Sequence, residues 1–477
     1  MADLRPILIA SRPHTTPRSA TVQDKYTGAP LAEVCVAGET EVRAAIGAAH
    51  DARLAMANLP LHVRASVLRS VAQALRERRE EFAPTLVAEV GKPIALSRGE
   101  MDRAIETFSI SAEEAERGAG GVLPLDASRL GEGYFAVTVR QPIGPCSFIT
   151  PFNFPLNLAA HKIGPAIAAG CPFVLKPDDR TPLTSLLLGE ILAATDLPLG
   201  AFSILPCPDA GRDLLTTDDR LKLLSFTGSP RVGWALKARA GRKRVALELG
   251  GNAACIVDET VDPARVIERI AGGGFSQAGQ SCISVQRVLV HRSIYDAVRD
   301  GVAQRAEKIN QRRDRDDESA ILGPVIDETS AERIESWLAD AVAAGARVIV
   351  GGRRAGAWVE PTVVEGTPHD ARLWSDEVFG PVVVFEPFDE FEEALAVADD
   401  SAWGLQAGVF TERIDRALRA LERLEVGGVI VNDIPSTRLD SMPYGGVKGS
   451  GLGREGPRWA IEDMTETRVM VVSRRSS

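Results

Sequence analysis

The stretch Gly144-Pro-Cys-Ser-Phe-Ile-Thr150 is a short apolar run that ends in a polar residue, and it opens the part of the chain that decides the fold. Similar runs follow it in alternation with segments of helical periodicity. The runs lie at 172–176, 201–205 and 221–226, and the helical segments at 156–169 and 185–194. Such alternation predicts a parallel sheet with helices on both faces. We therefore predict an α/β fold built on a doubly wound, Rossmann-like domain.

Polar residues, glycine or proline follow the carboxyl ends of these predicted strands. They are Thr150 to Asn153, Lys176 to Asp179, Pro206 and Gly228-Ser229. Open α/β sheets bind ligands at this edge, and the amides at a helix N-terminus beside Gly228 favour a phosphate. The spacing of Gly228 and Gly233 matches neither a GxGxxG fingerprint nor a P-loop, so that motif alone is weak. Together these strand ends indicate a dinucleotide site.

The flanking segments predict further helices and a second α/β domain. An edge strand at 31–36 precedes amphipathic helices over 39–89, interrupted at Pro60, and a helix over 100–118. On the C-terminal side, strand-like runs at 287–290, 346–350, 382–385 and 428–431 alternate with helices. Two alternating stretches, 134–141 and 466–473, are typical of exposed strands that need a partner along their edges.

Composition and charge exclude several classes of function. The chain has 477 residues, 45% hydrophobic and 25% charged, a balance typical of packed domains. The formal net charge of -10, with both signs interspersed, offers no basic face for nucleic acid or an anionic membrane. No signal peptide or membrane-spanning run is expected. The six cysteines form no CxxC pair, which favours a cytoplasmic protein without disulfides or a metal site.

One cysteine and one glutamate are candidates for chemistry. Cys282 follows Gly279-Gln280-Ser281, and glycine on the approach is typical of a thiol that a substrate must reach. The alternative is a buried, inert cysteine. Glu248 lies in an apolar strand just before Gly250, where a buried carboxylate has a raised pKa and is suited to act as a general base. The alternative for Glu248 is an exposed position on an edge strand.

Seven short motifs follow one another along the chain. They are Pro151-Phe152-Asn153-Phe154-Pro155, Lys176-Pro177, Phe226-Thr227-Gly228-Ser229, Glu248-Leu249-Gly250-Gly251, Gly279-Gln280-Ser281-Cys282, Glu377-Val378-Phe379-Gly380-Pro381 and Pro443-Tyr444-Gly445-Gly446. In order and approximate spacing they resemble the motif series of the NAD(P)-dependent aldehyde dehydrogenase superfamily, nearly from end to end. Each motif alone is weak evidence, but the ordered series is highly specific. The stretch from Arg438 to Tyr444 is similar to the lactaldehyde, sulfolactaldehyde and non-phosphorylating glyceraldehyde-3-phosphate dehydrogenase branch.

The resemblance implies a reaction sequence for three catalytic residues. Cys282 attacks the aldehyde carbon, and the side-chain amide of Asn153 and the backbone N–H of Cys282 hold the resulting oxyanion. Hydride transfer to the nicotinamide leaves a thioester, which water activated by Glu248 hydrolyses. No metal takes part in this chemistry. The residue types agree with it, since a thiol is a soft nucleophile and a carboxylate accepts a proton.

The resemblance also implies a cofactor site at the predicted strand ends. Its expected residues are Thr150, Pro151, Lys176, Asp179, Gly228, Ser229, Leu249, Glu377 and Phe379. Lys176 is expected at a ribose, Gly228 and Ser229 at the pyrophosphate, and Glu377 and Phe379 at the nicotinamide end. Many members that use NAD carry Glu at the position of Asp179. The carboxylate of Asp179 favours NAD, whereas the adjacent Arg180 leaves NADP open.

Three basic residues predict the substrate class. His161 stands where many members that oxidise apolar aldehydes carry Trp, and Arg103 and Arg438 supply two further donors. We predict that they bind a small polar or anionic hydroxyaldehyde, such as lactaldehyde or sulfolactaldehyde. The alternative is a structural role for each. Ser281 replaces an arginine that phosphate-handling members often carry, which argues against a phosphorylated aldehyde.

The predicted architecture has three parts. Residues 1–125 and 143–250 form the NAD(P)-binding domain, residues 251–450 the α/β catalytic domain, and residues 126–142 and 463–477 a small β oligomerisation ribbon. The resemblance implies that the tail strand pairs with the 130–141 ribbon across an oligomer interface, giving a homodimer or a homotetramer.

Three other functions were weighed against aldehyde oxidation to the acid. A cysteine hydrolase needs a histidine beside Cys282, and the nearest in sequence, His291, is expected to be exposed. A CoA-acylating aldehyde dehydrogenase is a closer alternative, but Glu248 favours water as the acyl acceptor. A non-catalytic binding protein on the same scaffold is expected to lose catalytic residues, whereas Cys282, Glu248 and Asn153 are all present.

Overall fold

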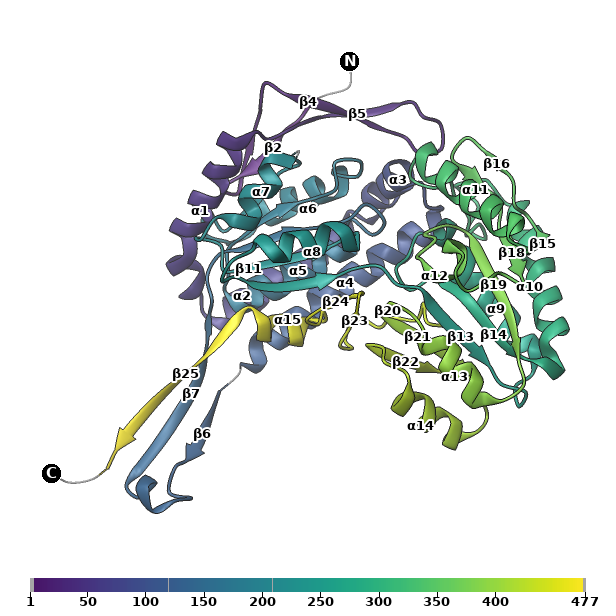
Figure 1. Cartoon of the computed structure of the whole chain (residues 1–477). Coiled ribbons are helices and arrows are strands. Elements are labelled where there is room, and N and C mark those ends of the chain that lie inside the picture. Colours follow the sequence, from purple (N-terminus) through teal and green to yellow (C-terminus); the bar gives the residue numbers. More distant parts are fainter. Residues whose placement is uncertain (1–3, 119, 208, 475–477) are drawn as a thin grey trace.

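Two α/β lobes lie beside each other, and a narrow β-ribbon projects from the first of them (Figure 1). The computed structural model describes residues 4–118, 120–207 and 209–474. The outermost residues of the predicted segments 1–125 and 463–477 lie outside this description, as do residues 119 and 208. Within the described part of the chain, no helix combines the length and the apolar character needed to cross a membrane.

The first lobe is built on an eight-stranded sheet with the order β24-β12-β11-β8-β9-β10-β2-β3. Its strands are β2 (Ile7–Ile9), β3 (Arg12–His14), β8 (Cys146–Ile149), β9 (Phe173–Lys176), β10 (Phe202–Ile204), β11 (Leu223–Thr227), β12 (Arg244–Glu248) and β24 (Gly451–Leu452). The five central strands are parallel, and the direction of winding reverses between β8 and β11. The sheet is therefore doubly wound, as predicted, and its topological switch point lies where β8 and β11 end.

Helices pack on both faces of this sheet. They are α1 (Glu39–Ala57), α2 (Leu61–Glu77), α3 (Arg79–Val90), α4 (Ile94–Arg117), α5 (Asn157–Ala169), α6 (Leu183–Ala193), α7 (Asp209–Thr217), α8 (Pro230–Arg239) and α15 (Pro457–Asp463). All residues of α5 are buried, because α2, α4 and α15 cover it. A small outer sheet adds β1 (Leu4–Arg5), β4 (Ser19–Gln23) and β5 (Pro30–Cys35). The helix predicted over 100–118 begins earlier, at Ile94, directly after Pro93.

The second lobe contains a seven-stranded sheet with the order β15-β18-β19-β14-β13-β21-β22. Its strands are β13 (Ala253–Val257), β14 (Val285–His291), β15 (Arg347–Val350), β18 (Thr362–Glu365), β19 (Val382–Phe388), β21 (Gln406–Phe410) and β22 (Gly428–Val431). Its helices are α9 (Pro263–Phe275), α10 (Tyr295–Asn310), α11 (Glu328–Ala343), α12 (Arg372–Ser375), α13 (Phe391–Asp399) and α14 (Ile414–Arg423). Short pairs, β16 (Arg354–Ala355) with β17 (Trp358–Val359) and β20 (Trp403–Gly404) with β23 (Val447–Lys448), complete the lobe.

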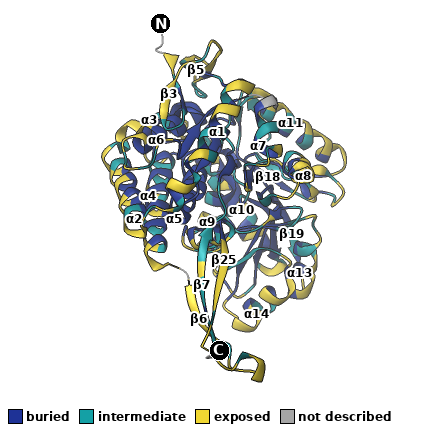
Figure 2. Cartoon of the chain, turned by 90° about the vertical axis from the view of Figure 1, so that its left-hand side faces the viewer, coloured by how far each residue is buried: buried dark blue, intermediate teal, exposed yellow. Residues whose placement is uncertain are grey.

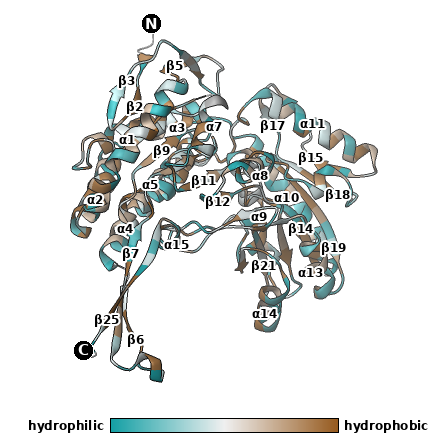
Figure 3. Cartoon of the chain, turned by 60° about the vertical axis from the view of Figure 1, so that its left-hand side comes forward, coloured by the Kyte–Doolittle hydropathy of each residue, from teal (hydrophilic) through white to brown (hydrophobic). Residues whose placement is uncertain are grey.

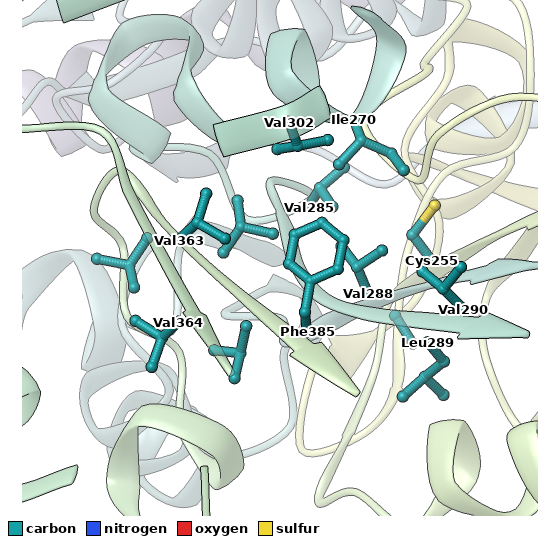
Figure 4. Packing of buried hydrophobic residues seen from close by; sticks show 14 of the residues in the cluster. Cys255, Ile270, Val285, Val288, Leu289, Val290, Val302, Val363, Val364 and Phe385 are labelled. Carbon is teal, nitrogen blue, oxygen red and sulfur yellow. The ribbon is translucent and has the colours of Figure 1, made fainter. Parts of the chain in front are cut away.

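A dry core holds this second sheet against its helices. Phe385 of β19 lies among valines of the two flanking strands, β14 and β18, and below Ile270 and Val302 of the covering helices (Figure 4). Side chains of this kind fill the space between the layers and hold the strand ends in fixed positions. The loop that follows α9 therefore starts from a rigid base where it contacts Asn153 of the first lobe.

The projecting ribbon is a three-stranded antiparallel sheet of order β25-β7-β6. It consists of β6 (Gly120–Pro124), β7 (Tyr134–Pro142) and β25 (Thr465–Ser473). Two differences from the prediction appear here. The tail strand pairs with β7 of the same chain rather than across an interface, and β6, which the boundary at residue 125 assigns to the first domain, pairs with β7 along its whole length.

The ribbon exposes apolar side chains. Figure 2 shows β6 and β25 coloured largely as exposed and β7 largely as intermediate, and Figure 3 shows hydrophobic residues along the ribbon as well as in the interior of both lobes. Val469, Met470 and Val471 are exposed by more than half of their surface, at 54%, 59% and 54%. An apolar strip of this kind on an edge strand is typical of a surface that another chain covers.

Candidate active site

The predicted cofactor residues meet at the switch point of the first sheet. Thr150, Pro151 and Asn153 follow β8, Lys176 is the last residue of β9, and Gly228 and Ser229 join β11 to α8. Ser229 precedes Pro230 at the first helical position of α8, so free backbone donors face this edge. Thr150 and Thr227 each have a buried hydroxyl oxygen without a hydrogen-bond partner. A site that supplies polar ligand atoms would satisfy both hydroxyls.

Cys282 sits after a strained turn at the end of α9. Gln277 and Ala278 adopt left-handed backbone angles, with φ of 52° and 54°, and Gly279 has φ of 66°. A Cβ at Gly279 would overlap the carbonyl oxygen of Gly380, so only glycine fits here. Cys282 is partly exposed, whereas the other five cysteines are buried. The turn thus places the one partly exposed thiol of the chain directly after it.

Asn153 forms hydrogen bonds with residues of both lobes, next to this turn. Its side-chain amide donates to the carbonyl of Gln280 at 2.9 Å. Its own carbonyl accepts hydrogen bonds from Lys92 of the first lobe at 2.8 Å and from Gln277 of the second lobe at 2.5 Å. Lys92 is fully buried and pairs with Glu100, which also caps the N-terminus of α5. These contacts fix the amide of Asn153 against the carbonyl of Gln280, two residues before Cys282.

Glu248, the last residue of β12, is buried at 4% exposure, and neither carboxylate oxygen has a hydrogen-bond partner. A Cβ at Gly445 would lie 2.9 Å from its Oε1, so the absence of a side chain there makes room for the carboxylate. Burial, reinforced by the nearby Glu455, raises the pKa of Glu248 well above its ordinary value. Because β12 lies inside the sheet between β24 and β11, the alternative of an exposed edge residue is wrong.

The thiol of Cys282 lies 3.0 Å from the hydroxyl of Tyr444. Tyr444 belongs to the motif Pro443-Tyr444-Gly445-Gly446, but the sequence indicated no role for its side chain. Burial raises the pKa of the Cys282 thiol to about 12, while the hydrogen bond with Tyr444 and the charge of Arg438 act in the opposite direction. Glu248 and Glu377 both act on the same thiol, which places the two carboxylates near it. Cys282, Glu248 and Asn153, the three catalytic residues expected from the sequence, therefore lie in one region of the fold.

Glu377 and Phe379 belong to the loop that joins α12 to β19. The carboxylate of Glu377 accepts a hydrogen bond from the backbone N–H of Gly251 at 3.0 Å, and a Cβ at Gly250 would lie 2.5 Å from its Oε2. Burial raises the pKa of Glu377 to about 7. Phe379 adopts a left-handed φ of 48° and packs edge-on against Phe152, which follows β8. Leu249, another predicted contact, is buried against α8.

Lys176 and Asp179 form a pair with both carboxylate oxygens 3.2 Å from Nζ. Arg180, whose charge was expected to allow NADP as an alternative cofactor, is bound to other side chains of the protein. Its guanidinium binds Asp178 at 2.9 and 3.0 Å and Asp327 of the second lobe at 3.0 Å, and it lies over the ring of Phe152.

The three predicted substrate residues are bound to carboxylates. Arg103 and His161 both donate to Asp440, at 2.7 Å each, and Arg438 donates to Glu455 at 3.1 Å. Burial, with the charge of Arg438, lowers the pKa of His161, so the neutral imidazole donates through Nε2. Two polar atoms of this group remain buried without a partner, His161 Nδ1 and Arg438 Nε.

Two acidic residues in this cluster escaped prediction. Asp440 anchors Arg103 and His161, and Glu455 binds Lys162 at 2.8 Å as well as Arg438. Although burial acts in the opposite direction, Lys162 and Arg438 lower the pKa of Glu455 to about 2. The signal in the sequence was weak, because Asp440 pairs with Arg103 and His161, and Glu455 with Lys162, all more than 250 positions away. Among the described residues, no cluster of histidine, cysteine and carboxylates suited to a metal ion occurs.

Comparison with known proteins agrees with this geometry. Residues 12–470 match the model of the aldehyde dehydrogenase family. A 3-sulfolactaldehyde dehydrogenase of Priestia aryabhattai is 44% identical over 461 residues, 96% of this chain and 96% of the relative. A lactaldehyde dehydrogenase of Methanococcus aeolicus is 35% identical, over 95% of this chain and 97% of the relative. The crystal structure of aldehyde dehydrogenase 21 from Physcomitrella patens, in complex with the reaction product succinate, is similar with a TM-score of 0.97 and 47% identity over 99% of both chains.

The chain belongs to the aldehyde dehydrogenase family. The predictions of an α/β fold of this class and of an NAD(P)-dependent aldehyde dehydrogenase, an oxidoreductase, are confirmed.

Proposed function

We propose that this enzyme oxidises a small aldehyde with an anionic or hydroxylated tail to the carboxylate, using NAD⁺ and a covalent intermediate on Cys282. Two observations carry the proposal: the Asn153 amide is held against Gln280, two residues before Cys282, and the unpaired carboxylate of Glu248 lies against Gly445, next to the Tyr444 that contacts the thiol. A buried carboxylate without a partner destabilises the resting fold, so its retention is explained by a reaction that needs a base.

The chain's own residues divide the chemistry into two stages. The Cys282 thiolate adds to the aldehyde carbon, and the Asn153 amide and the Cys282 N–H stabilise the oxyanion of the thiohemiacetal, each contributing roughly 3 kcal/mol. NAD⁺, held by the residues at the switch point, would supply the acceptor for the hydride from that carbon. Collapse of the oxyanion leaves a thioester, and Glu248 takes a proton from the water that attacks it. The products are the carboxylate, NADH and two protons for each aldehyde and water consumed.

Several features of the described residues fit a dinucleotide. Gly250 leaves space beside the carboxylate of Glu377, where a side chain would collide with it, and the orphaned hydroxyls of Thr150 and Thr227 lie on the strands that flank the switch point. Glu377 is suited to bind the hydroxyls of the nicotinamide ribose, Phe379 to wall the nicotinamide, and Ser229 and Gly228 to hold the pyrophosphate at the N-terminus of α8. Lys176 and Asp179 are suited to the adenosine ribose.

The same edge of the sheet favours NAD over NADP. A 2′-phosphate needs a free cation, but the guanidinium of Arg180 is held by Asp178, Asp327 and the face of Phe152. Asp179 remains beside Lys176 and opposes a phosphate by charge repulsion. We therefore assign NAD as the cofactor, with weaker use of NADP.

Three observations support an anionic or hydroxylated aldehyde. The relatives include enzymes named for sulfolactaldehyde and lactaldehyde, and the similar plant structure contains succinate. These compounds share a short chain with a polar group beyond the reacting carbon. In this chain the free Nε–H of Arg438 is suited to an anion, and the unprotonated Nδ1 of His161 to a substrate hydroxyl.

Steady-state kinetics tests the proposal directly. We would measure NADH formation with sulfolactaldehyde, lactaldehyde, succinate semialdehyde, glyceraldehyde 3-phosphate and propanal, for the wild type, Cys282→Ala and His161→Phe. An anionic or hydroxylated aldehyde should have the highest kcat/KM, Cys282→Ala should be inactive, and His161→Phe should lose the preference for hydroxylated aldehydes over propanal. Turnover that survives in Cys282→Ala would overturn the proposal. Acyl-CoA formation in the presence of CoA would favour the acylating alternative.

We further propose that the enzyme is a homodimer or a homotetramer assembled through the ribbon. The exposed strip on β25 and the free outer edges of β25 and β6 support this assignment. The three-part division predicted from the sequence fits the same proposal, with the ribbon beginning at Gly120.

A further inference from the structure

We propose that the hydroxyl of Tyr444 is a catalytic group of the dehydrogenase reaction, which donates a hydrogen bond to the Cys282 thiolate and holds it ready for attack. This inference rests on the proposed role of Cys282 as the nucleophile. The two side chains are 3.0 Å apart, within the range for a hydrogen bond to sulfur. No other hydrogen bond to the sulfur occurs among the described residues. Tyr444 therefore contacts the reacting atom itself.

The position of the hydroxyl is fixed from two sides. The backbone of Tyr444 forms a bridge with Glu455, with N–H to O distances of 3.0 and 2.6 Å. The ring is buried against Ile283 and Leu405, together with Cys282. Since Ile283 is the residue after Cys282, the ring and the thiol are held by one small apolar cluster. The hydroxyl has little freedom to leave the sulfur.

The guanidinium of Arg438 lies over the ring of Tyr444, 3.7 Å from its centroid. Glu455 holds this guanidinium by a 3.1 Å hydrogen bond and is itself bound by Lys162. A cation on the face of a phenol withdraws electron density from the ring, so its O–H is a stronger donor. One residue, Glu455, thus positions both the backbone of Tyr444 and the cation above its ring.

The charges around the thiol explain why a donor is needed. Glu377 in the loop before β19 and Glu248 at the end of β12 both disfavour a negative charge on Cys282 and raise its pKa. The positive charge of Arg438 lowers that pKa. Burial, followed by the charge of Cys282, raises the pKa of Tyr444 well above that of a free phenol, so the hydroxyl keeps its proton and remains a donor. When the thiol ionises, its proton passes to solvent water and Tyr444 stabilises the anion that remains.

This role predicts a specific change in thiol reactivity. Hydrogen bonds to charged groups contribute enough that removing this one should raise the pKa of Cys282 by about one unit or more. Because nucleophilicity rises with thiol pKa with a slope of about 0.5, each remaining thiolate should react about threefold faster. In Tyr444→Phe, alkylation of Cys282 should therefore slow by about threefold at neutral pH, because the loss of thiolate outweighs the gain in nucleophilicity.

The experiment measures the pH dependence of carboxamidomethylation of Cys282 by iodoacetamide in the absence of cofactor, with peptide mass spectrometry to identify the modified residue. Wild type, Tyr444→Phe and Tyr26→Phe are compared. Tyr26 is a matched control, because its hydroxyl is buried without a partner and its ring packs against Trp358. Circular dichroism establishes that each variant is folded. The kcat/KM of Tyr444→Phe, which reports thiol ionisation in the free enzyme, should fall, and the acidic limb of its pH profile should move to higher pH.

The outcomes separate this inference from the proposed function. An unchanged pKa of Cys282 in folded Tyr444→Phe overturns the role of the hydroxyl and leaves the nucleophile in place. Full turnover by wild type with alkylated Cys282 overturns the proposed function itself. If Tyr444→Phe does not fold, a fluorinated tyrosine at position 444 supplies the test, because its more acidic hydroxyl should lower the pKa of Cys282. No decrease in that protein contradicts the inference.

Discussion

At the scale of single residues, Glu248 is the side chain whose surroundings depart furthest from ordinary protein chemistry. It is buried, its carboxylate has no hydrogen-bond partner, and Glu455 adds a second negative charge nearby. We expect Glu248→Gln to keep the first hydride transfer but to slow thioester hydrolysis by about 10²- to 10⁴-fold. Rapid-mixing measurements of NADH should show a burst of about one equivalent followed by a slow steady state.

The pH dependence of the same step follows from the raised pKa of Glu248. A general base must be ionised, so hydrolysis should slow as pH falls through a pKa that lies above the ordinary range for glutamate. This acidic limb should be absent from the residual rate of Glu248→Gln. An identical limb in both proteins would assign it to another group.

Cofactor choice also belongs to the residue scale. Removing the carboxylate of Asp179, as in Asp179→Ser, should raise kcat/KM for NADP relative to NAD by at least about tenfold, equivalent to ~1.4 kcal/mol. Lys176 then has no carboxylate within the pair and is available to the 2′-phosphate. Asp196→Ser serves as a control at a surface position away from these contacts. Equal shifts in the two variants would show that Asp179 does not select the cofactor.

Sequence reasoning located most of this site but missed part of it. Cys282, Glu248 and Asn153 were identifiable because the chemistry of each depends on its own residue type and its neighbours in the sequence. Tyr444 and Asp440 were not, because their roles arise from partners more than a hundred residues away. Arg103 was predicted as a substrate ligand, yet its guanidinium is occupied by Asp440, a pairing that no local pattern encodes.

At the scale of elements, the turn over Ser276–Gly279 determines where the thiol sits. Gly279→Ala would place a Cβ against the carbonyl of Gly380 at a left-handed φ, so we expect a loss of at least about 2 kcal/mol of stability and of nearly all activity. Gly272→Ala is the matched control, because no atom lies near its added Cβ and it sits within α9, where alanine is preferred. Thermal unfolding of both variants provides the comparison, and equal melting temperatures would contradict this account of the turn.

Elements with strong periodicity were predicted well, and the parallel strands β8, β9, β10 and β11 of the doubly wound sheet lie within about two residues of their expected positions. The outer strands β2, β3 and β24 were not predicted. Three inner strands of the second sheet, β13, β18 and β21, were missed. Each is a short apolar run buried on both faces, so it lacks the alternation that marks a half-exposed strand. The first turns of α4, before Glu100, were missed. The sequence around Pro93 indicated the end of a helix, whereas Pro93 is the residue directly before α4 begins.

At the scale of the whole molecule, the ribbon carries the exposed apolar surface that we expect another chain to cover. Val469→Glu, which puts a charge on the exposed apolar strip of β25, should dissociate the proposed oligomer into smaller species without unfolding the lobes. Light scattering after size-exclusion chromatography reports the mass. Leu54→Glu, at a comparably exposed position on α1, should leave the assembly unchanged. A monomeric wild type, or dissociation by both variants, would contradict the assignment of the ribbon.

The central claim is that Cys282 carries the acyl group during turnover, and mass spectrometry of the intact enzyme tests it most directly. Glu248→Gln is mixed with NAD⁺ and the preferred aldehyde, quenched in acid within the burst, and digested for peptide mapping. The account predicts an added mass equal to the acyl group on the peptide that contains Cys282, and none in Cys282→Ala. Steady turnover of the wild type, with no adduct on Cys282 in either the wild type or Glu248→Gln, would contradict it.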